Sequence, residues 1–434
     1  MPLKKILLKA GVNRENTRYT SEGGWYECNN VRFRQGTPEK IGGWTRLNTV
    51  KFLGVARSLW NWITLGGQNL IGVGTNIKFY IENGGTFNDI TPLRSTTSAG
   101  EVTFSASVTT LSAAITSTTA TTIPITDATG FPLVGLILID SEVISYTGIT
   151  DNTLTGCSRG AAKLVNDVAT NTTAATHSNS AGVTCFTILV SDANNGATAG
   201  DFVTFTDAAP MGGNFTAAVL NLEYEILTLE GSNKYTIVAR SFSNTTIAFS
   251  NVASTSADTG NGGSSTVGAY QLNVGVATAS EVSAWGAGGW GAGLFGQGVT
   301  SQEVLRIWSQ QNFGEDLIFG PRGGRIYYWA ATDDLRTRAV ELSGSNVPVI
   351  QNLILVSDIN RFVFCFGANP LGSTARDPML IRWSDQENAE NWTPDATNQA
   401  GSLRLSRGTE IVAASQARQE VLVWTDSSLS LIHI

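Results

Sequence analysis

Charged residues are scarce in this chain of 434 residues. Only 15% of the positions carry a charge, compared with about 25% in an average globular protein. The 35 Asp and Glu residues outnumber the 28 Lys and Arg residues, so the net charge is -7, and the pI is about 5.0. Domains that hold nucleic acid through phosphate contacts usually have a pI above about 9. The composition therefore argues against tight DNA binding.

Histidine and cysteine are also rare, although many catalytic and metal sites depend on them. The chain has two His and four Cys residues. His177 and His433 are the candidate imidazole bases, and the sequence contains neither a His pair at zinc spacing nor a CxxC motif. The cysteines stand far apart, at Cys28, Cys157, Cys185 and Cys365. This is not the cysteine density of a small disulfide-bonded domain, and we predict a protein without a metal ion or other cofactor.

Long apolar runs are missing. The opening residues 1–9 place only three apolar residues between their lysines, too few for the apolar core of a signal peptide. The longest apolar stretch, 131–139, is interrupted by Pro132 and Gly135, whereas a membrane helix needs about 18 apolar residues or more. We expect neither export through a signal peptide nor a membrane span.

Alternation of apolar and polar residues is the dominant pattern. Segments such as 76–83 and 325–330 mix β-branched and aromatic residues and end at Gly or Asn, which is typical of strands. One short helix is predicted at 216–222, where Ala and Leu residues follow a Gly-Gly-Asn turn. The sequence predicts an all-β fold.

Composition divides the chain into a host and an insert. Residues 95–275, which we call the insert, contain four basic and 13 acidic residues, a net charge of -9. Residues 1–57 contain 11 basic and four acidic residues, a net charge of +7. We predict four parts: an N-terminal segment with the first blade or blades (1–94), a small β module (95–166), a second β module (167–277), and a Gly/Trp loop with further blades (278–434).

The host shows a weak internal repeat. Residues 60–81 and 308–329 both read as an aromatic residue, a polar turn, an apolar strand, a Gly-containing turn and an aromatic strand. Shorter segments with a similar pattern occur at 361–383 and 410–424. Successive hairpins of this kind predict propeller blades, which bury their apolar faces by packing on their neighbours. Because the last predicted blade stops part-way, we expect an incomplete β-propeller-like body and a truncated chain.

The Gly/Trp loop at 285–298 contains two overlapping GxGxxG matches. A dinucleotide fingerprint needs a helix after the glycines and an acidic residue about 20 positions on, and residues 297–303 do not read as a helix. The loop also has two other interpretations. Its large apolar side chains either dock against a neighbouring chain or pack back on their own domain. These candidate interface residues are Trp285, Trp290, Leu294 and Phe295.

Acidic clusters suggest two kinds of chemistry. Glycoside hydrolysis needs two carboxylates across a cleft, and close carboxylate pairs occur at Glu315 with Asp316, Asp333 with Asp334, and Asp385 with Glu387. These pairs lie in turn contexts, where carboxylates are usually solvated. The segments 192–196 and 258–263 are rich in oxygen ligands and resemble calcium loops, but they fit ordinary Asx turns equally well. We predict no enzymatic activity and no metal site.

Two stretches resemble proteins of bacteriophage tails. The stretch 10–44 reads AGVNRENTRYTSEGGWYECNNVRFRQGTPEKIGGW, and it resembles the start of the tail nozzle, or DNA-stabilisation, proteins of short-tailed bacteriophages. The Gly/Trp loop and the blade that follows it resemble the same family. Within the insert, the stretch 130–160 reads GFPLVGLILIDSEVISYTGITDNTLTGCSRG and is similar to small β modules of many phage tail proteins.

The resemblance implies a virion protein made in the cytoplasm of a bacterial host. It implies a homohexameric ring below the head-to-tail connector, a channel through which DNA passes without tight binding, and contacts with tail fibres and a tail plug. Because DNA must slide freely, we expect the basic segment 1–57, including Arg32, Arg34 and Lys40, to face protein and not the channel. The alternative is a β-rich carbohydrate-binding or glycan-cleaving protein.

Overall fold

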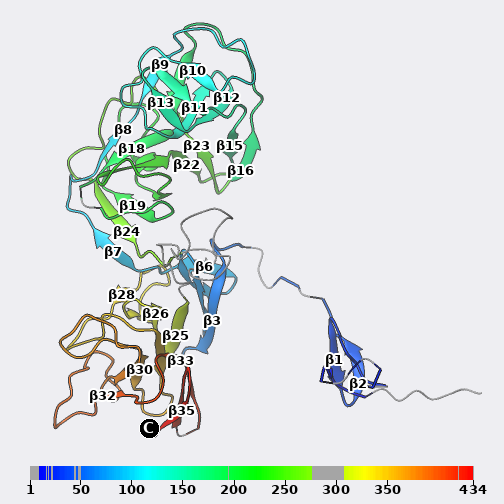
Figure 1. The fold of residues 1–434 in the computed structure, drawn as a ribbon. Helices are drawn as coiled ribbons and strands as arrows, with labels where there is room; N and C mark the ends of the chain where they lie inside the picture. Colours follow the sequence, from blue (N-terminus) through cyan, green and yellow to red (C-terminus); the bar gives the residue numbers. More distant parts are fainter. Residues whose placement is uncertain are drawn as a thin grey trace, which may run out of the picture. The chain divides into compact units, whose positions relative to one another are not determined.

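The computed structural model describes residues 9–15, 17, 19–20, 23–43, 45–46, 50–193, 195–275, 307–418 and 420–433. The chain divides into two compact units, Met1–Lys51 (unit 1) and Phe52–Ile434 (unit 2), and Figure 1 shows their strands. The predicted interface residues Trp285, Trp290, Leu294 and Phe295 lie outside the described residues.

The predicted all-β fold is confirmed. The described residues form many small antiparallel sheets and one short helix, α1 (Ala217–Leu220). This helix lies inside the segment 216–222 that the sequence predicts to be helical. It is a single turn, in which Val219 and Leu220 are buried. The strands are short because Gly and Asx turns interrupt the apolar alternation every few residues.

Unit 2 contains four sheets that we call the body. The first has strands β3 (Ala56–Ile63), β4 (Asn69–Thr75), β5 (Phe79–Asn83) and β6 (Thr86–Asp89). The second has β25 (Trp308–Phe313), β26 (Asp316–Pro321), β27 (Tyr327–Trp329) and β28 (Val340–Glu341). The third has β29 (Leu353–Val356), β30 (Val363–Phe366), β31 (Leu380–Trp383) and β32 (Gly401–Arg404). The fourth has β33 (Ile411–Gln416), β34 (Glu420–Thr425) and β35 (Leu429–His433).

Each body sheet follows the chain order, and each packs on the next one. Three apolar cores lie between the first and second, the second and third, and the third and fourth sheets. Successive residues of a strand point to opposite faces, so one strand serves two cores. In β26, Leu317 and Phe319 join the first of these cores, whereas Ile318 joins the second. The alternating pattern of the sequence thus produces a row of stacked sheets.

The first strands of the body sheets are neighbours. β3 contacts β25, β25 contacts β29, and β29 contacts β33. Both copies of the weak sequence repeat, 60–81 and 308–329, fall within the first three strands of a sheet. The first strands of the four body sheets therefore lie together on one side of the row of sheets.

The insert forms two domains, one nested in the other. The inner domain, residues 108–185, contains β9 (Val108–Thr110), β10 (Thr122–Pro124), β11 (Gly135–Ile139), β12 (Glu142–Tyr146), β13 (Gly148–Thr150), β14 (Thr153–Thr155), β15 (Ala162–Val165), β16 (Val168–Asn171) and β17 (Gly182–Cys185). The outer domain, residues 93–107 and 186–271, contains β7 (Leu93–Thr96), β8 (Thr103–Ser105), β18 (Thr187–Ser191), β19 (Phe202–Thr206), β20 (Glu223–Glu225), β21 (Lys234–Val238), β22 (Arg240–Ser243), β23 (Ala248–Asn251) and β24 (Val267–Gln271). Each has its own apolar core and shares no sheet with the other.

This nesting differs from the tandem modules 95–166 and 167–277 that the sequence suggests. The boundary at 166/167 falls in the turn between β15 and β16, which pair with each other. Val102 and Phe104 belong to the outer core, while Val183 and Cys185 belong to the inner core. Alternation identifies strands but not their partners, so it does not reveal that the chain leaves the outer domain and later returns to it.

Unit 1 contains a hairpin of β1 (Val31–Arg34) and β2 (Thr37–Lys40). The turn between them is Gln35-Gly36, and both residues have positive φ, 51° and 81°, as the turns of two-residue hairpins require. Trp25 packs its ring edge against Phe33, with 6.0 Å between the ring centroids.

Candidate functional site

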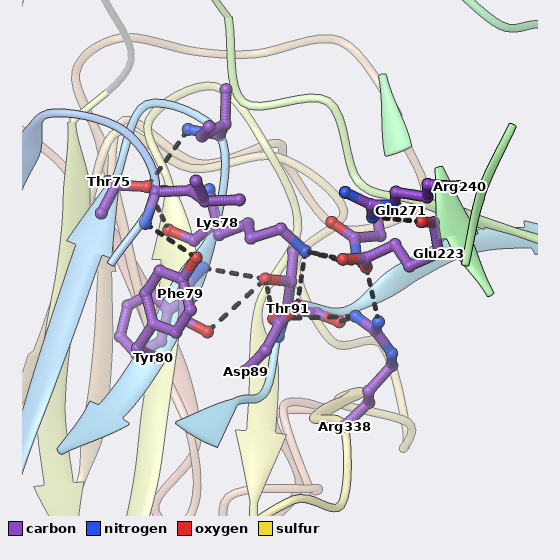
Figure 2. Close-up of polar contacts among 12 residues, drawn as sticks. Thr75, Lys78, Phe79, Tyr80, Asp89, Thr91, Glu223, Arg240, Gln271 and Arg338 are labelled. Atoms are coloured by element: carbon purple, nitrogen blue, oxygen red, sulfur yellow. Dashed lines mark hydrogen bonds and ion pairs between the residues drawn. The ribbon is translucent and has the colours of Figure 1, made fainter. Parts of the chain in front are cut away.

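A buried lysine lies where the body meets the insert. Lys78 follows β4, in the turn that leads into β5, and only 2% of its side chain is exposed. Its ammonium group donates to Asp89 Oδ2 at 2.6 Å and to both carboxylate oxygens of Glu223 at 2.8 Å. Asp89 ends β6 of the body, whereas Glu223 begins β20 of the outer domain. Figure 2 shows these side chains converging.

The turn that presents Lys78 is built by Thr75. The Thr75 hydroxyl accepts the Lys78 backbone N–H at 2.8 Å and donates to the Lys78 carbonyl, also at 2.8 Å. Thr91 fixes the other side, because its backbone N–H donates to Asp89 Oδ1 at 2.9 Å and its hydroxyl donates to the same oxygen at 2.5 Å. Thr75 and Thr91 therefore hold Lys78 at the start of β5 and Asp89 at the end of β6, which is the neighbouring strand.

A second cation completes the cluster, which we call the charged junction. Arg338, between β27 and β28, donates to Glu223 Oε1 at 3.1 Å and to the Thr91 carbonyl at 2.9 Å. Its guanidinium lies 3.7 Å from Asp89 Oδ1. Gln271 of β24 donates through its amide to Glu223 Oε1. Two cations and two carboxylates balance, so their burial leaves no net charge.

Burial and the neighbouring charges shift the pKa values of Asp89 and Tyr80 in opposite directions. Burial alone would raise the pKa of Asp89, but Lys78 and Arg338 hold it below its ordinary value. Burial raises the pKa of the Tyr80 hydroxyl, and Asp89 and Glu223 nearby raise it further. Asp89 is therefore ionised and Tyr80 is neutral at physiological pH, which is the state that the ion pairs require.

A pocket of about 280 Å³ lies beside the charged junction. Its walls come from the body at Asn76 and Ile77, from the outer domain at residues 198–202 and Gln271, and from residues 272–275, which follow the outer domain. Lys78 lies over the ring of Phe202, with 4.6 Å from its ammonium nitrogen to the ring centroid. The lining presents amide, hydroxyl and one carboxylate group, at Asn76, Asn273, Gln271, Thr198 and Asp201. This arrangement binds the insert to the body and offers hydrogen-bonding groups to solvent.

A second ionic cluster lies inside the inner domain. Glu142 is fully buried and accepts two hydrogen bonds from Arg159, each 2.7 Å long. His177 Nε2 lies 2.8 Å from Glu142 Oε2, and its Nδ1 lies 2.8 Å from Asp140 Oδ2. Burial would raise the pKa of Glu142, but the Arg159 guanidinium, the His177 ring and two backbone N–H groups lower it to about 2. His177, a candidate base from the sequence, thus has both ring nitrogens occupied by carboxylates.

The carboxylate pairs found in the sequence lie in loops between body strands or at their edges, and Asp316 is the first residue of β26. Glu315 accepts a hydrogen bond from the Leu65 N–H and Asp316 accepts one from the Tyr328 hydroxyl. Asp334 accepts the Arg336 N–H at 2.8 Å. Asp385 accepts the N–H groups of Gln386 and Gln399, and Glu387 pairs with Arg361 at 3.2 Å. These contacts order the loops between body strands.

The two oxygen-rich segments have different local structures. The Asp258 carboxylate accepts hydrogen bonds from the backbone of residues 213–215 and from the N–H and hydroxyl of Thr255. Both carboxylate oxygens of Asp258 thus accept hydrogen bonds that stabilise the local turns. Asp192 is 1% exposed and accepts a hydrogen bond from the Tyr270 hydroxyl. Among the described residues, no group of three or more His, Cys, Asp or Glu side chains could hold a metal ion.

The basic residues predicted to contact protein lie on the unit 1 hairpin. Arg32 and Arg34 are exposed on β1, and Lys40 is exposed on β2. Arg32 pairs with Glu39 across the hairpin at 3.1 Å, which holds the pKa of its guanidinium above its ordinary value through the hydrogen bond and charge of Glu39.

Sequence reasoning missed the charged junction. Its members lie at positions 78, 89, 223 and 338, so no local spacing links them, and each alone reads as an ordinary surface charge. The one available signal is Lys78 within the otherwise apolar run 77–81.

Comparison with known proteins adds no relative. Neither a scan against protein-family models nor a search of curated proteins finds a match. In the described part of the chain, no helix has the length and hydrophobicity that crossing a bilayer requires.

Proposed function

We propose that this chain is a structural protein of the tail of a short-tailed bacteriophage, a nozzle protein whose six copies form a ring below the head-to-tail connector. DNA passes through the ring, and tail fibres and a plug attach to it. The protein acts by assembly and performs no catalysis. The resemblance of the stretch 10–44 to such proteins motivates the proposal, together with the resemblance of the inner-domain stretch 130–160 to modules of phage tails.

The arrangement of the body sheets is the observation that carries the proposal. Four successive sheets each pack on the next, and their first strands lie side by side. In a β-propeller, blades are arranged in this way around an axis, with the first strand of each blade nearest to it. We therefore propose that the body is part of a propeller, a scaffold that can carry an inserted arm without changing its own packing.

The side formed by first strands, which would face the axis of the proposed propeller, carries few charges. A groove of about 270 Å³ runs there along β3, β25, β29 and β33. Its polar lining is mostly hydroxyl and amide, including Ser58, Gln311, Asn352 and Gln416, and Arg322 is the charged residue among its lining.

Negative-stain electron microscopy of the purified full chain tests the proposal. We expect rings with sixfold symmetry at micromolar protein concentration. Isolated monomers at every concentration would contradict a ring-forming nozzle protein. Monomers that bind a saccharide on a glycan array would support the alternative carbohydrate-binding function.

A further inference from the structure

Arg382 is a buried cation whose contacts are all with backbone carbonyls. It lies on β31, and 3% of the residue is exposed. Its guanidinium donates to the carbonyl oxygens of Asn369 at 3.2 Å, Asn346 at 2.6 Å and Trp392 at 3.5 Å. No carboxylate of the described residues forms an ion pair with it. Burial lowers the pKa of Arg382, but a guanidinium stays protonated in proteins.

Other buried cations of this chain are paired with acids. The side chains of Lys78 and Arg159 are buried, and each contacts a carboxylate. A buried charge is costly unless a group of opposite charge compensates it. An arginine side chain also has five N–H donors, so the three carbonyl contacts of Arg382 do not use them all. Arg382 therefore has both the charge and the donors to hold an anion.

Arg382 lines a pocket of about 470 Å³. The walls come from the connection between β28 and β29 and from the connection between β30 and β31. Asn346 lies in the first connection and Asn369 in the second, so the guanidinium ties the two walls together through their carbonyls. Pockets of about 300 to 1,000 Å³ are those that hold small ligands.

The rest of the lining suits a molecule that carries hydroxyl groups. Ser343 and Thr374 are exposed, and neither hydroxyl has a hydrogen bond with the described residues. Val347 and Leu371 add apolar surface to the same pocket. A sugar ring presents both hydroxyl groups and apolar C–H faces, so this mixture of side chains matches it.

The charges around the pocket select a ligand with one negative charge. Glu341 also lines the pocket, and it pairs with Arg325. A guanidinium fits a carboxylate through two parallel hydrogen bonds. A phosphate group carries about -1.5 to -2 at neutral pH, which exceeds the charge of one Arg382, and the Glu341 carboxylate would repel the excess. The pocket therefore favours a carboxylate over a phosphate.

We propose that this pocket binds an acidic sugar, a polyhydroxylated ring that carries one carboxylate. The carboxylate pairs with Arg382, and the ring hydroxyls bond to Ser343 and Thr374. Val347 and Leu371 contact the apolar face of the ring. This site goes beyond the proposed nozzle function and does not depend on the assembly of a ring of subunits.

Titration of the purified full chain with sodium glucuronate, followed by saturation-transfer difference NMR, tests the site. We expect saturable binding. Glucuronamide, in which a neutral amide replaces the carboxylate, should bind at least about tenfold more weakly, because hydrogen bonds between ionised groups are the stronger ones. Equal Kd values for the two sugars would overturn the proposal. Inorganic phosphate that binds more tightly than glucuronate would overturn it in favour of a phosphate site.

Three variants assign the binding to the pocket. Ser343→Tyr adds a ring at an exposed lining position and should weaken glucuronate binding about tenfold or more, because it fills the space that the sugar needs. Ser427→Tyr adds the same ring at an exposed turn of the fourth body sheet, outside the lining, and should bind like the unmodified chain. Arg382→Lys keeps the charge but loses the paired contact, and it should weaken binding by a similar factor. If this buried substitution prevents folding, Ser343→Tyr still decides: unchanged binding in that variant overturns the proposal.

Hydrogen exchange locates the bound sugar and separates this proposal from the nozzle. Glucuronate should slow exchange at residues 343–347 and 369–374 and leave β34 and β35 unchanged. Binding without slower exchange in those two segments would place the sugar elsewhere and overturn the site. Sixfold rings that bind no glucuronate would overturn the site and leave the nozzle function standing. Monomers at every concentration that bind glucuronate in this pocket would leave the site standing and contradict the nozzle.

Discussion

Single ionic residues hold the insert together and join it to the body. At residue scale, Glu142 and Lys78 play equivalent parts, because each is a buried charge whose partners come from distant strands. A buried pair is weak evidence for net stability, but removing one partner leaves an uncompensated charge and costs about 3 to 5 kcal/mol. Substitution of Glu142 or of Lys78 is therefore the most direct test of the cluster to which each belongs.

The Glu142 cluster predicts acid sensitivity of the inner domain. The folded pKa of Glu142 is about 2, below its ordinary value of 4.5. A lowered pKa contributes stability that is fully present above pH 4.5 and is lost as the pH falls towards 2. Hydrogen exchange of the Gly160 and Ala175 amides, which bond to Glu142, should show this loss once intrinsic rates are corrected.

Glu142→Gln should be less stable than the unmodified chain by about 3 to 5 kcal/mol at pH 6 and should lose less stability on acidification. Glu225→Gln, at an exposed position of the insert, is the control and should change little. Parallel pH profiles for Glu142→Gln and the unmodified chain would count against the role of this carboxylate.

The charged junction predicts coupling between body and insert. Lys78→Met removes the cation shared by Asp89 and Glu223 and leaves Arg338 as the remaining cation of the cluster beside them. We expect faster hydrogen exchange in β20 and in residues 198–202. Lys234→Met, which removes an exposed charge from the insert, should not have this effect.

A double variant separates charge from packing at the same site. Lys78→Met with Glu223→Gln removes one charge of each sign, so it should recover part of the protection that Lys78→Met loses. If the two single effects simply add, the ion pair between these residues contributes nothing to the coupling.

At element scale, the stacking of body sheets depends on small residues in second strands. Gly72 and Gly74 of β4 lie against β25, where a Cβ on Gly74 would be 2.5 Å from Trp308 Cδ1 and 2.6 Å from Ser58 Oγ. Gly320 of β26 is similarly close to Ile354 of β29, with 3.1 Å from its ideal Cβ to the Ile354 Cδ1. Gly in a second strand therefore lets the next sheet approach, and the sequence repeat aligns Gly72 with Gly320.

Gly74→Ala should destabilise the body by about 1 to 3 kcal/mol, because overpacking moves Trp308 or the backbone. Gly66→Ala is the matched control, since its Cβ would meet only Thr64 Oγ1, at an ordinary 3.7 Å. Thermal unfolding measures the stability of both variants. Hydrogen exchange of β25 reports the local effect of each substitution. Equal effects at the two positions would show that sheet spacing does not depend on Gly74.

Much of the element structure could be predicted from sequence. Two-residue alternation indicated the strands of the body, and the repeat at 60–81 and 308–329 marked the starts of two sheets. The short helix near 216–222 was also found. Strand partners were not predictable, because Val183 pairs with Ile139 of β11, more than 40 positions away, and either residue alone is simply an apolar strand position.

At the scale of the whole molecule, composition separated the insert from the host but not its internal order. Net charge averages over a segment, so it detects the acidic stretch 95–275 without showing that one domain interrupts another. The charged junction escaped prediction for the same reason: its residues come from both sides of the insert and from within it. Burial and pairing arise only after the long-range topology is formed.

Nesting makes a specific prediction about deletion. Ser107 immediately precedes the inner domain and Cys185 is its last residue. Both are tied to one residue, because Cys185 N–H donates to Ser254 Oγ at 2.8 Å and that hydroxyl donates to the Ser107 carbonyl at 2.8 Å. The flanking strands β8 and β18 pair as antiparallel neighbours, so a short Gly/Ser turn can replace residues 108–185.

The nested deletion should give a soluble chain whose outer domain keeps its core and its contact with Lys78. Deleting residues 95–166 instead removes β8, the sheet partner of β18, and β11, the sheet partner of β17, so it exposes parts of two cores and should give an aggregated or protease-sensitive product. Both products lose a similar number of residues, and limited proteolysis with hydrogen exchange of β18 and β21 distinguishes them. A tandem arrangement predicts the reverse order: the deletion of 95–166 would be tolerated, while the deletion of 108–185 would cut through both modules.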